Sequence, residues 1–184
     1  MSGGWQGVAT ELVETRYGAL VGYATVLTGS RSDAEDVVHD ALIATFGKRR
    51  NFPNVAAAEG YVRRAIATRF LDRARRVGRE RIAMWRVATE PVEDVPGPEV
   101  LTADRSSIEA AMTLLSPKER ACVALRHMDQ LTTAETAAAL GIAEGSVKRY
   151  VYDGMRKLGK ALAIDTEDAD FEWTSVSSKK EGAA

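Results

Sequence analysis

Cysteine and histidine are scarce in this sequence, which has one cysteine and two histidines among 184 residues. A single cysteine cannot form an internal disulfide, and these few side chains lack the spacing of zinc ligands. Cys122 stands among Ala121, Val123 and Leu125, which favours a buried apolar role over a reactive thiol. No glycine-rich phosphate loop or carboxylate pair completes a catalytic set, so we expect no enzyme, no cofactor and no metal.

Long apolar runs are also missing. No segment approaches the ~20 residues that a membrane helix needs, and the N-terminus MSGGWQGVATE lacks the basic-then-apolar order of a signal peptide. Hydrophobic residues still make up 45% of the chain, which suffices for one ordinary core or two small ones. We therefore expect a soluble globular protein of the cytoplasm, with no membrane insertion.

Strand-like alternation of polar and apolar residues is absent, whereas apolar residues recur at three- and four-residue steps. This period predicts helical stretches in the first half of the chain at 8–28, 33–46 and 57–77, and a further turn at 82–85. Gly29 is placed to end the first helix. Ser32 and Glu35 have the spacing of a capping box for the second helix.

Proline is rare and unevenly placed, since three of the five prolines fall within residues 90–99, among acidic side chains. This composition resists helix formation and has little to bury, so we place an extended linker at 87–103. Pro53 and two asparagines mark a shorter loop at 48–54. The predicted fold class is all-α, with two small helical bundles joined by an extended linker.

Capping signals predict the helices of the second bundle. After a helical stretch at 106–115, Ser116 is placed as the N-cap of a helix over 117–128, with proline at its first position. Thr132 and Glu135 form another capping box, which opens a short helix. All helices predicted in this half are short.

The stretch 132–158 has the spacing of a helix-turn-helix. Ala137 is a small residue where two helices approach, Gly141 can take a positive φ in the turn, and Val147 anchors the second helix. That second helix carries four basic side chains, namely Lys148, Arg149, Arg156 and Lys157. We interpret it as a DNA recognition helix.

Charges are segregated along the chain, although the net charge is only −1. Residues 48–81 hold eleven Lys and Arg against three Asp and Glu, a balance of +8, and residues 114–164 have a balance of +3. The stretches 1–47, 82–113 and 165–184 each have a balance of −4. Two basic blocks between acidic ones predict contact with a polyanion at two separate places.

Two sets of motifs follow one another along the chain. The first set is DAEDVVHDAL at 33–42, YVRRAIA at 61–67 and DRARR at 72–76. The second set is LLSPKER at 114–120, AETA at 134–137, GI at 141–142 and EGSVK at 144–148. In this order, with an acidic prolyl linker between them, they resemble bacterial RNA polymerase sigma factors of the extracytoplasmic-function (ECF) type, in the sigma-70 family.

The resemblance implies a domain plan and a function. Residues 1–86 would form a region 2-like domain for core polymerase and the −10 element, and residues 104–163 a region 4-like domain for the −35 element. The linker at 87–103 would join them, and 164–184 would be a disordered tail. The implied protein is an alternative sigma factor that directs promoter-specific initiation and promoter melting. Its implied partners are the clamp and flap of core RNA polymerase, promoter DNA and an anti-sigma factor.

Site residues carry over from the resemblance by position. The helix matching 33–46 would bind the polymerase clamp through Asp33, Glu35, Asp36 and Asp40. The loop before 61–76 and the helix itself would capture the melted −10 strand through Lys48, Arg49, Arg50, Phe52, Asn54, Tyr61, Arg64 and Arg69. The −35 duplex would be read by Lys148, Arg149, Tyr152 and Arg156.

Two positions depart from the family pattern. Thr68 stands where asparagine is frequent near the −10 strand, and Asp153 stands in the recognition helix where arginine is common. An acid facing DNA repels phosphate or accepts a hydrogen bond from a cytosine amino group, so Asp153 bears on the −35 sequence.

Several alternatives stay open from the sequence. The acidic residues of 33–46 also suit a plain solvated face, and Phe52 and Tyr61 suit core packing as well as base stacking. A regulator that binds duplex DNA alone is the alternative function. Ala183 and Ala184 resemble the small apolar end of substrates for ClpX-type proteases, whereas the other interpretation of the tail is a disordered end.

Overall fold

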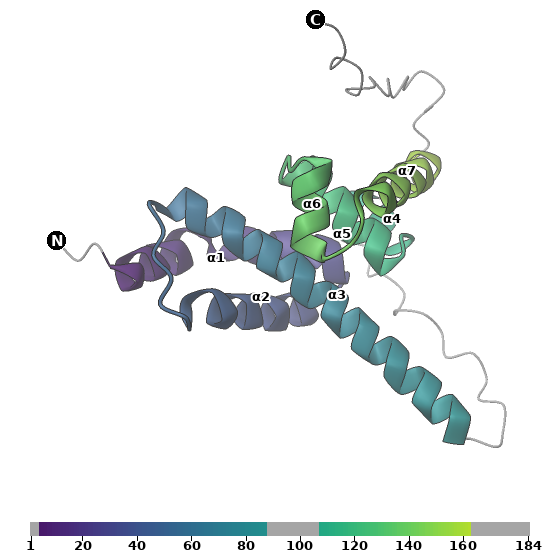
Figure 1. Cartoon of the computed structure of the whole chain (residues 1–184), viewed down its shortest axis with the longest axis horizontal. Coiled ribbons are helices and arrows are strands. Elements are labelled where there is room, and N and C mark those ends of the chain that lie inside the picture. The colour runs from purple at the N-terminus through teal and green to yellow at the C-terminus, as the bar shows by residue number, and fades with distance from the viewer. Residues whose placement is uncertain (1–3, 88–106, 163–184) are drawn as a thin grey trace, which may run out of the picture.

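The computed structural model describes residues 4–87 and 107–162, and every regular element among them is helical (Figure 1). The elements in chain order are α1 (Trp5–Thr28), α2 (Arg31–Phe46), α3 (Val55–Val87), α4 (Ser107–Thr113), α5 (Pro117–Val123), the π-helical turn η1 (Ala124–Met128), α6 (Thr133–Leu140) and α7 (Glu144–Ala161). The all-α prediction is confirmed. The linker was predicted over 87–103, but Val87 still belongs to α3. The rest of that linker and the predicted tail at 164–184 lie outside the described residues.

Helices α1, α2 and α3 form the first bundle, because each presents an apolar stripe to one core. Leu20 and Leu27 of α1 meet Val38 of α2 and Val62 and Ile66 of α3, and all five side chains are fully buried. Burial of a side chain of this size stabilises the fold by about 1.5–3 kcal/mol relative to leaving it exposed. The three-helix core is therefore the main source of stability for this half.

The turn between α1 and α2 is tighter than the sequence predicted. Gly29 ends α1 as expected, with a left-handed φ of 76°. Ser30, not Ser32, is the N-cap of α2, since its hydroxyl accepts from the Asp33 N–H at 3.4 Å. The predicted capping box is wrong because the extended residue that a cap requires directly follows the glycine, and α2 already begins at Arg31.

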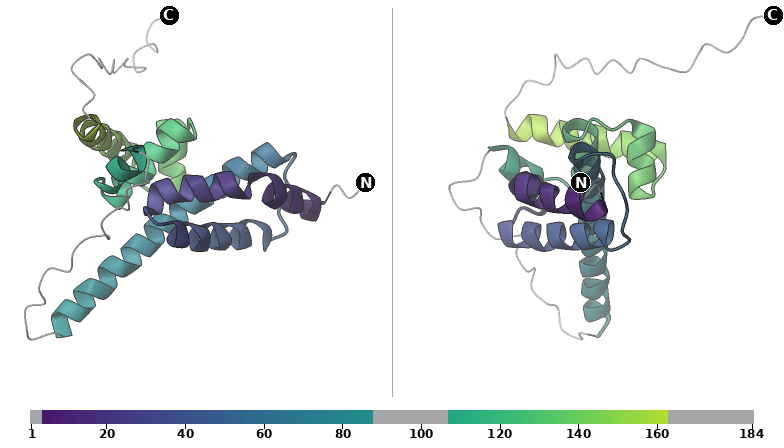
Figure 2. Two further views of the ribbon diagram at one scale, coloured as in Figure 1. Left: turned by 180° about the vertical axis from the view of Figure 1, so that it is seen from behind. Right: turned by 90° about the vertical axis from the view of Figure 1, so that its left-hand side faces the viewer.

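Helix α3 continues past its predicted end at Val77 as far as Val87, so the turn predicted at 82–85 is part of the same helix. Two ion pairs at helical spacing stabilise the exposed stretch after Leu71: Arg75 with Asp72 at 3.2 Å, and Arg76 with Glu80 at 3.0 Å. Gly78 stands in open space within the helix and does not end it. The C-terminal half of α3 projects away from both bundles (Figures 1 and 2).

In the second bundle, α4 to α7, helices α5 and α6 begin where the capping signals predicted. Helix α7 has 18 residues, so the prediction that all helices of this half are short is wrong for it. Ser116 accepts from the Glu119 N–H at 3.4 Å and Thr132 from the Glu135 N–H at 3.2 Å. Each glutamate also accepts from the N–H of its cap residue at 2.8 Å, which completes both capping boxes. Gly141 has φ of 63° in the turn of the helix-turn-helix, as its position predicted.

The helix predicted over 117–128 widens before it ends. Regular α5 stops at Val123, and η1 follows with the Asp129 N–H donating to the Ala124 carbonyl at 3.2 Å, five residues back. The next residue, Gln130, has φ of 54°. Cys122, just before the change, is fully buried, which confirms its apolar role.

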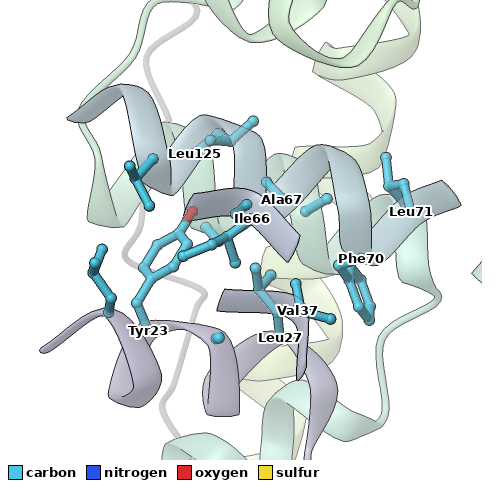
Figure 3. Packing of buried hydrophobic residues seen from close by; sticks show 14 of the residues in the cluster. Tyr23, Leu27, Val37, Ile66, Ala67, Phe70, Leu71 and Leu125 are labelled. Atoms are coloured by element: carbon cyan, nitrogen blue, oxygen red, sulfur yellow. The ribbon is translucent and has the colours of Figure 1, made fainter. Parts of the chain in front are cut away.

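The two bundles pack against each other, with α4, α5, η1 and α6 lying along α1 and α3 (Figure 2). Leu125 of η1 is fully buried in the same cluster as Tyr23 of α1 and Ile66 of α3 (Figure 3). A second, smaller cluster around Met112, Leu115 and Leu158 holds α4 against α7. The sequence predicted two bundles and did not predict the interface between them.

Candidate nucleic-acid interface

Helix α7 separates an apolar face from a basic one. Val147, Val151 and Leu158 are buried against the second bundle, as their three- to four-residue spacing requires. The four residues predicted for the −35 duplex all face solvent: Lys148, Arg149, Tyr152 and Arg156. They share one side of an 18-residue helix, the arrangement that a helix in the major groove requires.

Tyr150 lies beside the start of this basic face and contacts two cationic side chains. Its ring lies 5.1 Å from the Arg149 guanidinium carbon and 5.7 Å from the Lys118 ammonium of α5. Arg149 also donates to the Tyr150 hydroxyl at 3.5 Å. Asp153 is half-buried on the same helix. The basic face is therefore flanked by an aromatic ring and by one acid.

The loop between α2 and α3 carries an aromatic cluster. The Phe52 ring centroid lies 5.7 Å from that of Phe46 and 5.5 Å from that of Tyr61. The Arg50 guanidinium lies 4.4 Å from the Tyr61 ring centroid. Phe52 and Tyr61 are both half-buried, so in this structure they pack against one another as the core-packing interpretation proposed.

Basic side chains surround that cluster. Lys48, Arg49 and Arg50 are exposed on the loop, and Arg49 has φ of 50°. Such a left-handed backbone is uncommon for a residue other than glycine, and it turns the chain sharply after α2. Arg64 and Arg69 are exposed on α3. The structure thus brings the predicted −10 residues to one end of the first bundle and the adjoining face of α3.

Asn54 has a structural role that the sequence analysis missed. Its side-chain oxygen accepts from the Ala57 N–H at 2.9 Å, which makes it the N-cap of α3. Helix α3 consequently begins at Val55, two residues before the predicted start. An asparagine just before a run that contains three successive alanines, Ala56 to Ala58, is a recognisable helix start, and this signal was available in the sequence.

The acidic face of α2 is partly paired with α3. Arg73 lies 2.7 Å from an Asp33 oxygen and 3.6 Å from an Asp36 oxygen. Glu35 pairs with Arg31 on the same helix at 3.1 Å, and Asp40 is exposed. The four predicted clamp residues therefore lie on one helix, and Arg73 neutralises part of their charge.

A cluster that the sequence did not reveal joins the two bundles. The Tyr23 hydroxyl of α1 donates to the Asp129 carboxylate at 2.8 Å, and Arg63 of α3 donates to its other oxygen at 3.3 Å. Burial raises the pKa of Asp129, although hydrogen bonds from Tyr23 and Arg63 act in the opposite direction. Burial, with Asp129 beside it, also raises the pKa of Tyr23. These residues are far apart along the chain, so no local pattern could have placed them together.

Within residues 4–87 and 107–162 no group of His, Cys, Asp and Glu side chains is arranged to hold a metal ion. None of the helices described is both long and apolar enough to cross a membrane.

Both bundles match models of known protein families. The family model for Sigma-70 region 2 matches residues 12–80, and that for Sigma-70, region 4 matches residues 105–158. The RNA polymerase sigma-E factor of Streptomyces coelicolor is 32% identical over 161 residues, which cover 86% of this chain and 88% of that protein. The sigma-E factor of Streptomyces antibioticus is 34% identical over 162 residues, covering 87% and 86%.

Similar proteins also include a sigma factor of the ECF type and a sigma factor of known structure. The ECF sigma factor SigE of Mycolicibacterium smegmatis is 32% identical over 158 residues, covering 83% of this chain and 61% of that protein. The fold is similar to that of the sigma factor RpoE of Bartonella quintana, solved in complex with the anti-sigma factor NepR. The TM-score is 0.60 at 24% identity, over 85% of this chain and 97% of the other. The chain belongs to the ECF sigma factors of the sigma-70 family, proteins without enzymatic activity that direct transcription initiation through promoter recognition by regions 2 and 4.

Proposed function

We propose that this sigma factor divides promoter recognition between two surfaces. Helix α7 reads the −35 duplex, and the loop at 47–54 with α3 captures the melted −10 strand. The observation that carries the proposal is the orientation of α7. Its buried face is apolar, while Lys148, Arg149, Tyr152 and Arg156 all point to solvent.

Duplex recognition needs base-edge donors near the start of a helix and phosphate contacts around it. Lys148 and Arg149 lie in the first turns of α7, so they suit base contacts. Arg156 lies two turns further on and suits a phosphate. Tyr152 offers an exposed ring between them. Asp153 beside Tyr152 favours a cytosine amino group over an acceptor at the neighbouring position.

A melted strand needs neutralised phosphates and surfaces for unstacked bases. Lys48, Arg49 and Arg50 supply positive charge beside the Phe52 and Tyr61 rings. Arg50 already covers the Tyr61 ring at 4.4 Å, so a nucleotide base that stacks on Tyr61 displaces a cation rather than water. Arg64 and Arg69 extend the positive surface along α3 for the strand backbone.

Core RNA polymerase is the protein partner, and we infer that its clamp binds the acidic face of α2 through Asp33, Glu35, Asp36 and Asp40. The second bundle is assigned to the flap. Arg73 holds Asp33 and Asp36 in place, so the two carboxylates reach a basic clamp surface already ordered. The chain acts in the cytoplasm, where core polymerase and the chromosome are.

Purified full-length protein added to core polymerase on a promoter library tests the assignment. We expect stable binding to core and initiation from promoters that share a two-part sequence, read from transcript 5′ ends. A protein that binds duplex DNA but neither binds core nor starts transcripts would support the alternative, a regulator acting on duplex alone.

We infer two further partners, an anti-sigma factor and a protease. The Bartonella quintana RpoE structure contains an anti-sigma factor, and we infer that this chain is also held by a protein of that class. The corresponding test is a co-purified partner that blocks core binding at one-to-one stoichiometry. For the C-terminal Ala183 and Ala184, replacing both with aspartate should lengthen the protein's half-life in cells if a ClpX-type protease recognises them. An unchanged half-life would rule that out.

A further inference from the structure

Arg149 and Asp153 of α7 carry opposite charges one helical turn apart. Side chains at this spacing are neighbours on a helix surface and commonly form an ion pair. Among residues 4–87 and 107–162, however, the Asp153 carboxylate makes no ion pair and no hydrogen bond. The recognition helix therefore carries a base and an acid side by side without neutralising either.

The Arg149 side chain is directed to Tyr150 instead. Its guanidinium carbon lies 5.1 Å from the Tyr150 ring centroid, and a terminal nitrogen donates to the Tyr150 hydroxyl at 3.5 Å. The ring face attracts a cation because its π-electrons carry partial negative charge. Tyr150 is about 1.5 Å further along the helix axis than Arg149, whereas Asp153 is about 6 Å further. The contact with Tyr150 thus holds the guanidinium near the start of α7, away from the carboxylate.

Packing fixes the Tyr150 ring in this position. The ring is half-buried against the cluster of buried side chains that includes Val147 and Val151 of the same helix. The Lys118 ammonium contacts it from α5, at 5.7 Å from the ring centroid. A side chain that positions another must itself be held by its surroundings, and Tyr150 meets this condition.

Stacking on Tyr150 leaves Arg149 able to bind a base. A guanidinium has five N–H donors in one plane, and the Tyr150 hydroxyl accepts from only one of its nitrogens. The remaining donors match O6 and N7 of a guanine in the major groove. An ion pair with Asp153 would occupy those donors, and it would also remove the acceptor that suits a cytosine amino group.

We propose that Tyr150 is a positioning residue for the −35 contact, which keeps Arg149 from pairing with Asp153, so that α7 offers a guanidinium to a guanine and a carboxylate to a cytosine. The inference rests on the proposed function, which assigns the −35 duplex to α7. Tyr150 acts through Arg149 and need not touch a base itself. Its replacement should therefore change the preferred sequence more than the overall affinity for DNA.

Nuclear magnetic resonance on the free full-length protein tests the contact without DNA. The ring current of Tyr150 displaces the Arg149 Nε–H signal, so Y150L should move that signal. Y17L, which removes an exposed ring from α1, should leave it in place. An Arg149 signal that Y150L does not move would overturn the proposal.

Binding of duplex DNA by the full-length protein with core polymerase tests the effect on specificity. Selection from randomised duplexes gives the preferred −35 sequence of the wild type, and R149A identifies the guanine that Arg149 reads. Y150L should lower the preference for this guanine over adenine about two- to threefold, the effect of an ion pair at i,i+4 spacing that competes for Arg149. Y17L should leave the preference unchanged.

Double variants separate positioning from simple packing. Y150L should cause no further loss of guanine preference in an R149A protein. It should also cause none in a D153N protein, where no acid remains to pair with Arg149. A loss of the same size in the wild-type, R149A and D153N backgrounds would overturn the role of Tyr150, because packing alone would then explain it.

Conservative variants complete the test. Y150F keeps the ring face and should restore most of the preference that Y150L loses, whereas equal losses in Y150F and Y150L would contradict the role of the ring. If Y150L fails to fold, Y150M takes its place in every comparison. A wild-type holoenzyme without any −35 preference would contradict the proposed function. A preference that R149A abolishes and Y150L leaves intact would overturn only the role of Tyr150.

Discussion

The Lys157 ammonium of α7 lies 2.8 Å from Oε2 and 2.9 Å from Oε1 of Glu119, the residue that completes the capping box of α5. Glu119 also accepts from the Ser116 N–H at 2.8 Å and is buried. The Glu119 carboxylate thus accepts a backbone hydrogen bond at the start of α5 and also anchors α7 to α5. The basic face of α7 is positioned by this anchor, although Lys157 itself is half-buried and turned toward Glu119.

Glu119→Gln should lower the free energy of unfolding at pH 7 by about 1–2 kcal/mol, because a charge-assisted pair and part of a cap are lost. Burial alone would raise the pKa of Glu119, but hydrogen bonds from Lys157 and Ser116 hold that pKa below its ordinary 4.5. The stabilisation is therefore complete above about pH 4.5 and is lost as the pH falls through the lower native pKa. Urea unfolding at several pH values measures this.

The matched control for that experiment is Glu11→Gln, at an exposed position of α1. It should change stability by less than about 0.5 kcal/mol at every pH. A loss for Glu119→Gln that is as large well below pH 4 as at pH 7 would show that its carboxylate charge does not contribute.

Arg149→Ala should weaken binding to −35 duplex by about 1–3 kcal/mol if Arg149 makes a bidentate base contact. Initiation from a template with a pre-melted −10 bubble should stay largely intact, since α3 and the loop before it are unaltered. Arg31→Ala removes the same charge from α2 and should leave duplex binding unchanged. Equal losses on duplex and bubble templates would contradict the division of labour between α7 and α3.

Substitutions at Asn54 separate its cap from its predicted contact with DNA. Asn54→Ala should destabilise the first bundle by about 0.5–2 kcal/mol, because the Ala57 N–H loses its acceptor. Asn54→Ser keeps a capping oxygen and should retain the stability, while it removes the amide. If Asn54→Ser also initiates like the wild type, Asn54 is only a cap; a selective loss of promoter opening supports the strand contact.

Gly154 marks the closest approach of α7 to its neighbours. A Cβ there would lie 2.8 Å from Cγ2 of Val123 and 3.2 Å from Cδ2 of Leu115. Gly154→Ala should therefore destabilise the protein by about 1–3 kcal/mol, despite the better helix propensity of alanine. Gly145→Ala on the same helix meets nothing within 4 Å and should stabilise it by about 0.5–1 kcal/mol. Thermal unfolding of both variants tests the contrast, and equal effects would contradict it.

Local signals predicted the helices well wherever a cap or a left-handed glycine marked the end. Thr132 with Glu135, Ser116 and Gly141 behave as expected because capping bonds form within four residues. The two wrong predictions, for the N-cap of α2 and the end of α3, also rest on local signals. The capping-box pattern predicts Ser32 as the N-cap, whereas the structure has Ser30 there. The helix predicted to end at Val77 continues, with ion pairs at helical spacing before and across that position.

In the candidate site too, local patterns predicted some features and could not predict others. Exposure of Arg149 and Tyr152 was predictable, because Val147, Val151 and Leu158 assign the opposite face of α7 to the core. The pairing of Arg73 with Asp33 was not, because it joins residues forty positions apart on two helices.

Helical class, the helix-turn-helix and two separated basic blocks are encoded in patterns a few residues long, so the amino-acid order was enough to establish them and the family that they resemble. The contacts between the two bundles are decided only by the tertiary structure. Asp129 lies 106 positions from Tyr23 and 66 from Arg63, and Arg120 lies 93 from Leu27. Burial and distance, which arise only when α1, α3 and η1 pack, turn an ordinary acid and an ordinary arginine into the contacts that hold the two bundles together.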